Sequence, residues 1–208
     1  MTPELAKSKS NRLLAQYGVL TNDALPCIEE IGALKPQMPE LVARRAIILT
    51  YIIGIAFDQP GSKLLQPLQE YGLANSLSAR EDQMLKLESY PKQDKIDAGW
   101  LDESIQSLAW TLGLAELDPF KNSDDDLPTI IPEPFSDPTD FIDSARLRPF
   151  DEIYQQADLY YRLHWVARDQ KRNKTSPPLS NGVMRERRRA LDWVLGVRAD
   201  WDTMELDT

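Results

Sequence analysis

Hydrophobic residues along this chain recur at steps of three and four, the spacing that places them on one face of an α-helix. The sequence has no stretch of sustained strand-like alternation. The pattern predicts helices over residues 4–17, 39–57, 61–72, 96–115, 149–171 and 182–195. Ser78-Ala-Arg-Glu81 has the composition of a capping box and predicts the start of one more helix.

Residues 118–138 interrupt the helical pattern. Prolines recur there, and a proline inside a helix removes a hydrogen-bond donor and clashes with the preceding turn. We therefore expect an extended connector across the surface, followed by a short helix capped by Asp137-Pro-Thr-Asp140. The chain as a whole is predicted to be an all-α single-domain helical bundle. Its parts are N-terminal helices over 1–117, one long irregular Pro-rich crossover over 118–138, and C-terminal helices with a docked tail over 139–208.

The composition agrees with one water-soluble domain. The chain has 208 residues, 42% apolar and 27% charged, which is enough for a real core. Its most apolar stretch, residues 46–57, is shorter than the ~18 residues of a membrane span, and residues 1–7 lack the apolar segment of a secretory signal. The single cysteine, Cys27, allows no intrachain disulfide, so we expect a cytoplasmic protein.

Charge is spread unevenly along the chain. The formal net charge is −9, and residues 51–145 alone hold 6 basic and 18 acidic side chains. An acidic region of this kind repels nucleic acid and would attract a basic protein surface. Acidic residues also keep a protein soluble, which is the simpler interpretation, and the sequence leaves both open.

Charged side chains also fall inside the apolar faces of two late helices. Asp158 and Arg162 are one turn apart in the predicted helix 149–171, in the order that favours an ion pair. Glu186 and Arg187 project within the apolar arc of the helix 182–195. Burying a charge is costly unless it is paired, so we expect these four side chains to meet in one semi-buried network, with Asp158 or the C-terminal carboxylates answering Arg187. The remaining polar face is expected to be solvated: Arg185, Arg188, Arg189 and Asp192.

The end of the chain is too apolar for a free tail, because it contains Trp201, Met204 and Leu206. We expect it to dock on the helices. Its acidic groups, Asp202, Asp207 and the terminal carboxylate, would then pair with basic side chains. The candidates for that pairing are Arg146, Arg148 and Arg187.

Residue types that signal known chemistry are scarce. His164 is the only histidine and lies among aromatic residues, which is typical of a core or rim histidine with a satisfied ring rather than a general base. One cysteine and one histidine cannot supply the ligands of a structural zinc site. The sequence contains neither a serine nucleophile elbow nor a phosphate-binding glycine loop. Asp124-Asp-Asp126 is interpreted as a solvated acidic tip. We therefore expect no metal and no cofactor.

Several short motifs in the last sixty residues resemble a bacterial family, the domain-of-unknown-function family 4272. These motifs are Leu147-Arg-Pro with Glu152-Ile, Asp158-Leu-Tyr-Tyr-Arg-Leu-His-Trp165, Glu186-Arg with Ala190-Leu-Asp-Trp193, and Trp201-Asp. A weaker similarity covers Trp100 to Gly113. The resemblance implies an all-helical fold and no particular activity, and it adds weight to the charged residues. The candidate ligand-binding or structural residues are Arg148, Glu152, Asp158, Arg162, His164, Glu186, Arg187 and Asp207.

Two functions fit this sequence. The first is a non-catalytic acidic protein of the immunity or antitoxin kind, which would use residues 51–145 to bind a basic protein partner. The second is an enzyme or small-molecule sensor in which the semi-buried Asp, Arg and Glu side chains bind an anionic ligand. Nucleic-acid binding is disfavoured, because the basic patch is small and the rest of the molecule is acidic.

Overall fold

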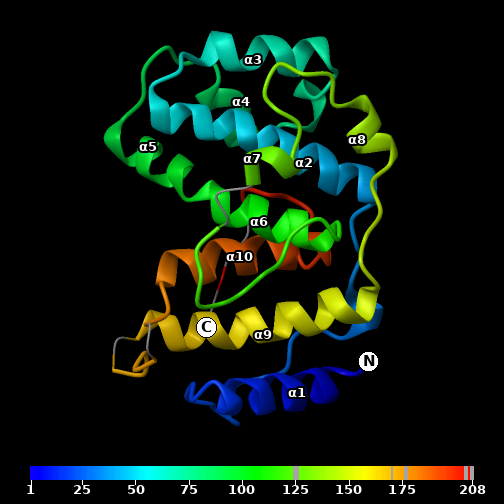
Figure 1. Ribbon diagram of the computed structural model, residues 1–208, viewed down its shortest axis with the longest axis vertical. Coiled ribbons are helices and arrows are strands. Elements are labelled where there is room, and N and C mark those ends of the chain that lie inside the picture. The colour runs from blue at the N-terminus through cyan, green and yellow to red at the C-terminus, as the bar shows by residue number, and fades with distance from the viewer. Residues whose placement is uncertain (124–126, 170, 176–177, 204–205, 207–208) are drawn as a thin grey trace.

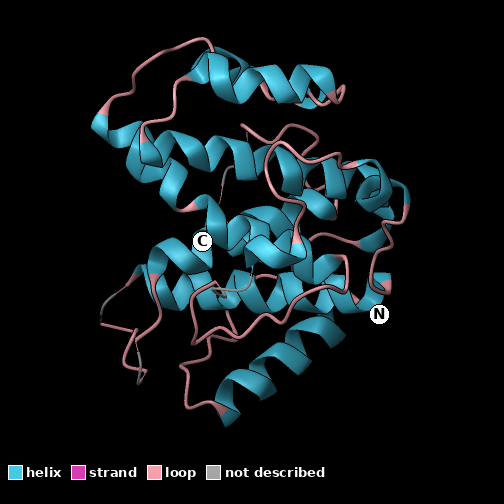
Figure 2. Cartoon of the chain, turned by 45° about the horizontal axis from the view of Figure 1, so that its top comes forward, coloured by secondary structure: helices cyan, strands magenta, loops and turns pink. Residues whose placement is uncertain are grey.

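The computed structural model of the chain describes residues 1–123, 127–169, 171–175, 178–203 and 206. Within these residues every regular element is a helix (Figure 2), as the sequence pattern predicts. The α-helices are α1 (Pro3–Gln16), α2 (Pro39–Ile53), α3 (Gly61–Glu70), α4 (Ala79–Met84), α5 (Lys92–Gly99), α6 (Leu101–Thr111), α7 (Leu127–Ile130), α8 (Thr139–Asp143), α9 (Phe150–Arg168) and α10 (Asn181–Val194). Single 3₁₀ turns occupy Ile31–Ala33, Gly54–Phe57 and Ala74–Ser76.

The longer helices form a stack (Figure 1). α1 packs on α9, α9 on α10, α10 on α6, α6 on α2, and α2 on α3. Helix α6 therefore lies in the middle of the molecule, covered by α10 on one side and by α2 on the other. None of the described helices is long and apolar enough to cross a membrane.

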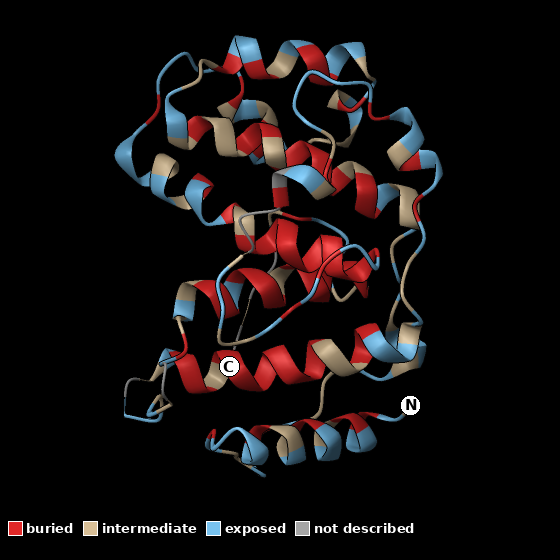
Figure 3. Ribbon diagram, in the orientation of Figure 1, coloured by how far each residue is buried: buried red, intermediate tan, exposed pale blue. Residues whose placement is uncertain are grey.

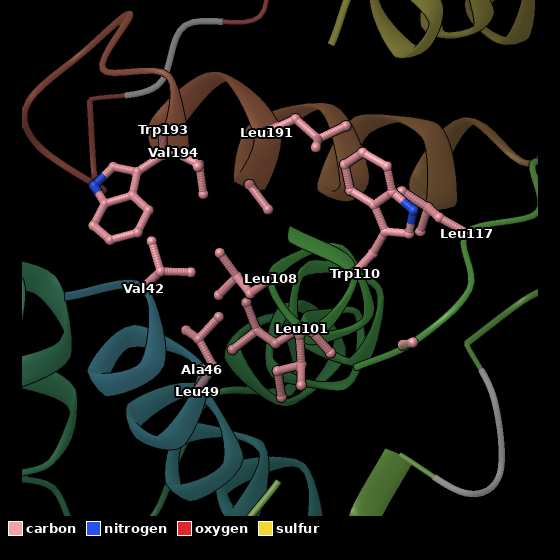
Figure 4. Packing of buried hydrophobic residues seen from close by; sticks show 14 of the residues in the cluster. Val42, Ala46, Leu49, Leu101, Leu108, Trp110, Leu117, Leu191, Trp193 and Val194 are labelled. Atoms are coloured by element: carbon pink, nitrogen blue, oxygen red, sulfur yellow. The ribbon is translucent and has the colours of Figure 1, made fainter. Parts of the chain in front are cut away.

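The core is centred on α6, which is buried around most of its circumference (Figure 3). Figure 4 shows Leu108 of α6 between Val42 and Ala46 of α2 and Val194 of α10. All four side chains are buried. Each large aliphatic side chain removed from water in this way contributes about 1.5–3 kcal/mol. The burial explains why α6 carries small polar residues between its apolar ones: neighbouring helices approach it from both sides.

Local signals in the sequence set several helix ends. The capping box forms at the start of α4, where the Ser78 hydroxyl accepts from the Glu81 amide and the Glu81 carboxylate accepts from the Ser78 amide. At α8, the Asp137 carboxylate accepts from both the amide and the hydroxyl of Thr139. Pro39 is the first residue of α2, a position where its missing amide costs nothing. The predicted capping box and the predicted start of α2 are confirmed. The predicted short helix is present as α8, but its N-cap is Pro138, and Asp137 bonds to Thr139 from one residue before the cap.

The predicted helix over residues 96–115 is wrong in its extent, because the structure has two helices there. α5 ends at Gly99 and α6 begins at Leu101. At the junction the Trp100 amide bonds to Asp97 and the Glu103 amide bonds to Trp100, so the chain makes i to i+3 bonds instead of the helical i+4 pattern. The Trp100 ring packs directly on Gly182 of α10, where an added Cβ would lie 3.0 Å from it.

The connector over residues 118–138 is irregular, as expected, but it is not fully extended, since it includes the one-turn helix α7. Leu127 and Ile131 at the ends of that turn are buried, which explains why the chain coils inward there. Further on, the Phe135 amide donates to the Tyr51 hydroxyl at 2.7 Å, and the Tyr71 hydroxyl donates to the Phe135 carbonyl at 3.2 Å. The connector is thus attached at Phe135 to α2 and to the end of α3.

The tail docks, as predicted, through Trp201. Its side chain is buried and meets the Trp193 ring edge-on at 5.5 Å, and the Arg189 guanidinium lies 4.5 Å from its ring centre. The predicted pairing of Asp202 with Arg146, Arg148 or Arg187 is wrong. Its carboxylate accepts from the Arg80 amide at 2.9 Å instead, because the tail turns toward the first turn of α4, where backbone donors lack helical partners. Met204, Asp207 and Thr208 lie outside the described residues.

Candidate functional site

Asp158 and Arg162 form a bidentate ion pair within α9. The Arg162 Nε and Nη2 atoms each donate to a carboxylate oxygen at 2.8 Å, and both side chains are almost completely buried. Nη2 also reaches the Pro26 carbonyl at 3.4 Å, in the segment between α1 and α2. Nη1 is buried without a hydrogen-bond partner. The pair therefore joins α9 to the N-terminal segment and has no opening to solvent of its own.

Arg187 is the most extensively bonded side chain of α10. Its Nε donates to Glu103 Oε2 at 2.8 Å, Nη1 donates to the Tyr160 hydroxyl and the Asp118 carbonyl, and Nη2 donates to the Lys121 carbonyl at 2.9 Å. The guanidinium is 1% exposed. Burial raises the pKa of Tyr160 to about 12, so its hydroxyl stays protonated beside the ion pair. Arg187 thus fastens the start of the connector to α6, α9 and α10.

The single network expected from Asp158, Arg162, Glu186 and Arg187 does not exist: Arg187 pairs with Glu103 of α6 and not with Asp158. The reason is the packing order, because α6 and α9 lie against different sides of α10. Sequence reasoning missed Glu103 as a partner. The signal was present, since Glu103 is the only charged residue in the buried run from Glu103 to Thr111.

The prediction that Arg188 and Asp192 are solvated is wrong, since both are buried where α10 faces α9. The Arg188 Nε donates to Asp192 at 3.1 Å, and Nη1 lies 3.3 Å from His164 Nδ1. Arginine can only donate, so Nδ1 of His164 accepts and the imidazole is neutral. Burial lowers the pKa of His164 to about 3, with Arg188 adding to the effect, and burial raises the pKa of Asp192 to about 7. Arg185, in contrast, is exposed as expected.

Arg148 and Glu152 lie apart from the buried pairs. The Arg148 Nε donates to the Trp110 carbonyl at 2.7 Å, and its guanidinium lies 5.0 Å from the Trp110 ring centre. Glu152 is exposed and 3.7 Å from Arg148, a weak surface pair. Asp207, the last candidate, is outside the described residues. The predicted candidates are therefore distributed over separate contacts and do not form one site.

A cleft of about 280 Å³ lies between α4, α5, α10 and the tail, and of the predicted candidates it contains only Glu186. The Glu186 carboxylate accepts from the Ser104 hydroxyl at 3.1 Å and from Arg189 at 3.4 Å. Both basic and acidic side chains line the cleft. They are Arg80, Glu81, Asp97, Arg185, Glu186, Arg189 and Asp202.

A second pocket, of about 370 Å³, lies beneath the connector. Its lining comes from α2, α6 and the connector: Thr50, Ile53, Asp102, Ile105, Ser123, Leu127, Ile131, Pro132, Glu133 and Pro134. The charged groups in this lining are the carboxylates of Asp102 and Glu133, and no lysine or arginine is among the described residues that line the pocket. Neither residue was singled out from the sequence, because no local pattern marks a pocket made by three distant segments.

Metal ligands do not gather in the described part of the chain, where no group of three or more His, Cys, Asp and Glu side chains is placed to hold an ion. Cys27 is a free, half-buried thiol.

The chain belongs to the family described as Domain of unknown function (DUF4272), whose family model matches residues 6–204. The match covers nearly the whole stack of helices and includes both pockets and all the buried ion pairs. No curated protein and no solved structure matches the chain.

Proposed function

We propose that this chain is a cytoplasmic, non-catalytic protein that binds a basic protein partner, in the manner of an immunity protein or antitoxin. The observation that carries the proposal is the connector face, which we define as the surface of residues 127–143. It presents four exposed carboxylates, Glu133, Asp137, Asp140 and Asp143. The sequence from 122 to 145 contains no lysine or arginine.

Unbalanced charge of this kind favours association with a basic surface. Complementary potentials accelerate encounter and disfavour partners of the same sign. The half-buried acids of α4 and α5 already have basic neighbours, for example Asp82 with Lys86 and Asp94 with Arg80. The carboxylates of the connector face form no ion pair within the described residues, so their charge is available to another molecule.

Phe135 adds an apolar anchor to the connector face. Its side chain is 54% exposed and meets the Tyr51 ring edge-on at 5.9 Å. Its backbone has φ 73°, a left-handed conformation that costs a non-glycine residue about 1 kcal/mol or more. Two tyrosine hydroxyls hold that conformation through hydrogen bonds. A fixed, exposed aromatic ring within polar surroundings is typical of a residue that dominates binding energy.

The test compares two sets of substitutions with the same change in charge. One variant neutralises the connector face by Glu133→Gln, Asp137→Asn, Asp140→Asn and Asp143→Asn. The control neutralises four exposed acids elsewhere, Glu4→Gln, Asp23→Asn, Glu29→Gln and Glu30→Gln. Tagged proteins are used to capture partners from a lysate of the source cells. We expect a basic protein to be retained by the wild type and the control and lost by the connector variant. Retention by all three proteins, or by none, contradicts the proposal.

A second function is favoured by one observation in the cleft: Arg80 and Arg185, with side chains 57% and 60% exposed, line it together with Arg189. Such a group of guanidinium groups suits a small anionic ligand, as a sensor or an enzyme would require. Titration with inorganic phosphate, followed by calorimetry, tests this alternative. Binding that is lost in Arg185→Gln supports it, and an absence of heat in the wild type rejects it for phosphate.

A further inference from the structure

We propose that the pocket beneath the connector receives a lysine side chain of the partner, with Asp102 and Glu133 binding the ammonium group. This inference rests on the proposed function and names the residue type that anchors the partner. The pocket volume of about 370 Å³ is that of a small ligand site.

The walls of the pocket suit an alkyl chain. Ile53 of α2 and Ile105 of α6 form one side, and Leu127, Ile131 and two prolines of the connector form the other. Four methylene groups separate the lysine backbone from its charge, and such stems pack on apolar surface while the ammonium reaches polar groups.

Two hydrogen-bond donors in the lining are already engaged. The Thr50 hydroxyl donates to the Ile47 carbonyl at 2.7 Å, and the Ser123 amide donates to Glu103 at 2.9 Å. Pro132 and Pro134 have no amide hydrogen. The charged groups of the lining, Asp102 and Glu133, are both acceptors, so the pocket favours an incoming group that is a hydrogen-bond donor or a cation.

The Asp102 carboxylate lacks the partners that the carboxylate of its neighbour Glu103 has. Both lie in the first turn of α6, but Glu103 is neutralised by Arg187 and accepts from the Ser123 amide. Asp102 is half-buried and has no hydrogen bond or ion pair within the described chain. Burial raises the pKa of its carboxyl, with repulsion from Glu103 as the second cause. A cation that enters the pocket would offset the cost of keeping the Asp102 carboxylate ionised away from water, because it would supply the missing opposite charge.

The position of the pocket links it to the connector face. Glu133 belongs to both, and Phe135 follows the lining residue Pro134 along the chain. A basic surface that docks on the connector face would therefore bring its lysines to the mouth of the pocket.

The experiment is a titration of the full-length, ¹⁵N-labelled protein with Nα-acetyl-lysine N-methylamide, followed by amide chemical shifts. The norleucine analogue, which keeps the alkyl stem and lacks the charge, is the matched control ligand. We expect saturable shifts at Asp102, Ser123 and Glu133 with the lysine probe only. Asp102→Asn should weaken that binding about tenfold, as expected for loss of a charge-assisted hydrogen bond.

Two further variants, at exposed positions, separate a loss of lysine binding from a loss of folded protein. Glu133→Gln changes an exposed side chain and should also weaken lysine binding, whereas Asp140→Asn on α8 should leave it unchanged, because Asp140 does not line the pocket. Equal shifts with norleucine, or no shifts with lysine, overturn the proposal. Tighter binding of the arginine analogue overturns the choice of lysine.

The outcome is separable from that of the proposed function. If capture of a basic partner depends on the connector face but the lysine probe does not bind, only the pocket assignment fails. If the lysine probe binds at Asp102 and no basic protein is captured, the protein-partner proposal fails and the ammonium site stands.

Discussion

The interface of α6, α9 and α10 and the connector face differ in what their carboxylates contact. In the interface, Glu103, Asp158 and Asp192 are buried and each meets an arginine within about 3 Å. On the connector face, four carboxylates are exposed and form no ion pair within the described residues. The same connector contributes to both regions, since Arg187 binds Asp118 and Lys121 at its start and the connector face begins at residue 127.

The difference separates charges that hold the fold from charges that are available for binding. A buried pair is costly to break, because removal of one partner leaves the other uncompensated. An exposed carboxylate contributes little to stability and can be replaced almost freely. The strongest sequence signal, charge inside late apolar helices, therefore indicates structural ion pairs, and the candidate binding surface lies in the segment without helical periodicity.

Breaking the buried pair of Arg187 with Glu103 should have the largest effect. Arg187→Met leaves Glu103 as a buried charge and removes four hydrogen bonds, so we expect the free energy of unfolding to fall by about 3–5 kcal/mol. Urea denaturation measures the loss. Arg185→Met, an exposed position on the same helix, is the control and should change stability by less than about 0.5 kcal/mol.

A double variant sharpens this test. Adding Glu103→Gln to Arg187→Met removes the uncompensated charge and should recover part of the lost stability. If the double variant is no more stable than Arg187→Met alone, the loss comes from packing, and the ion pair has no special role.

The next largest effect concerns a fourth buried pair, Arg45 with Glu81, which the docked tail covers. The Arg45 guanidinium lies 5.2 Å from the Trp201 ring centre and bonds both Glu81 oxygens. Trp201→Ala should cost about 3 kcal/mol, the lower end for a buried tryptophan, because the tail can partly relax. Thermal unfolding measures it, and Trp100→Ala, at a 41% exposed position, should shift the melting temperature less. Equal shifts would argue against docking as a source of stability.

Sequence reasoning found the elements of the fold because its signals are local. Helical stripes, the Ser78–Glu81 capping box and the apolar tail each depend on residues within a few positions, and the structure contains all three. The break at Trp100 was missed, because the helical stripe of Leu101, Ile105 and Leu108 follows residues 96–100 without a proline between them. Gly99, at which α5 ends, was the only local signal of the break.

The partners of the charged residues were harder to predict, for a physical reason. A helical wheel shows which side chains share a face, but which faces become buried depends on how many neighbours pack on the helix. α10 touches both α6 and α9, so Arg188 and Asp192 on its polar side are buried as well. The contact between Arg187 and Glu103 spans 84 residues of sequence, and only the packing order brings these two residues together.

The pH dependence of stability should be smaller and is set by the same interface. His164 has a folded pKa of about 3 against an ordinary value of 6.5, so the unfolded chain binds its proton more tightly. The contribution of the neutral His164 ring to the free energy of unfolding is therefore complete above pH 6.5 and is lost as the pH falls toward 3. His164→Gln removes this loss, so the wild type should lose stability relative to the variant between pH 6.5 and 4. Denaturation at several pH values measures the difference.

Asp192 provides the control of opposite sign. Its folded pKa of about 7 lies above the ordinary 3.8, so protonation favours the folded state and stability falls as the pH rises between these values. Relative to Asp192→Asn, the wild type should therefore weaken toward pH 7. If both variants track the wild type in parallel, the two groups do not titrate differently in the folded and unfolded states.

The smallest effect on stability is expected on the connector face. Each of Asp137→Asn, Asp140→Asn and Asp143→Asn should change the free energy of unfolding by no more than about 0.5 kcal/mol, because the side chains are exposed and unpaired. Asp137 is the most sensitive of the three, because its carboxylate accepts from the amide and the hydroxyl of Thr139, although the asparagine side chain keeps an oxygen that can accept the same bonds. If Asp140→Asn or Asp143→Asn instead costs as much as Trp201→Ala, these acids support the fold. The contrast between paired interior charge and available surface charge would then fail at the connector face.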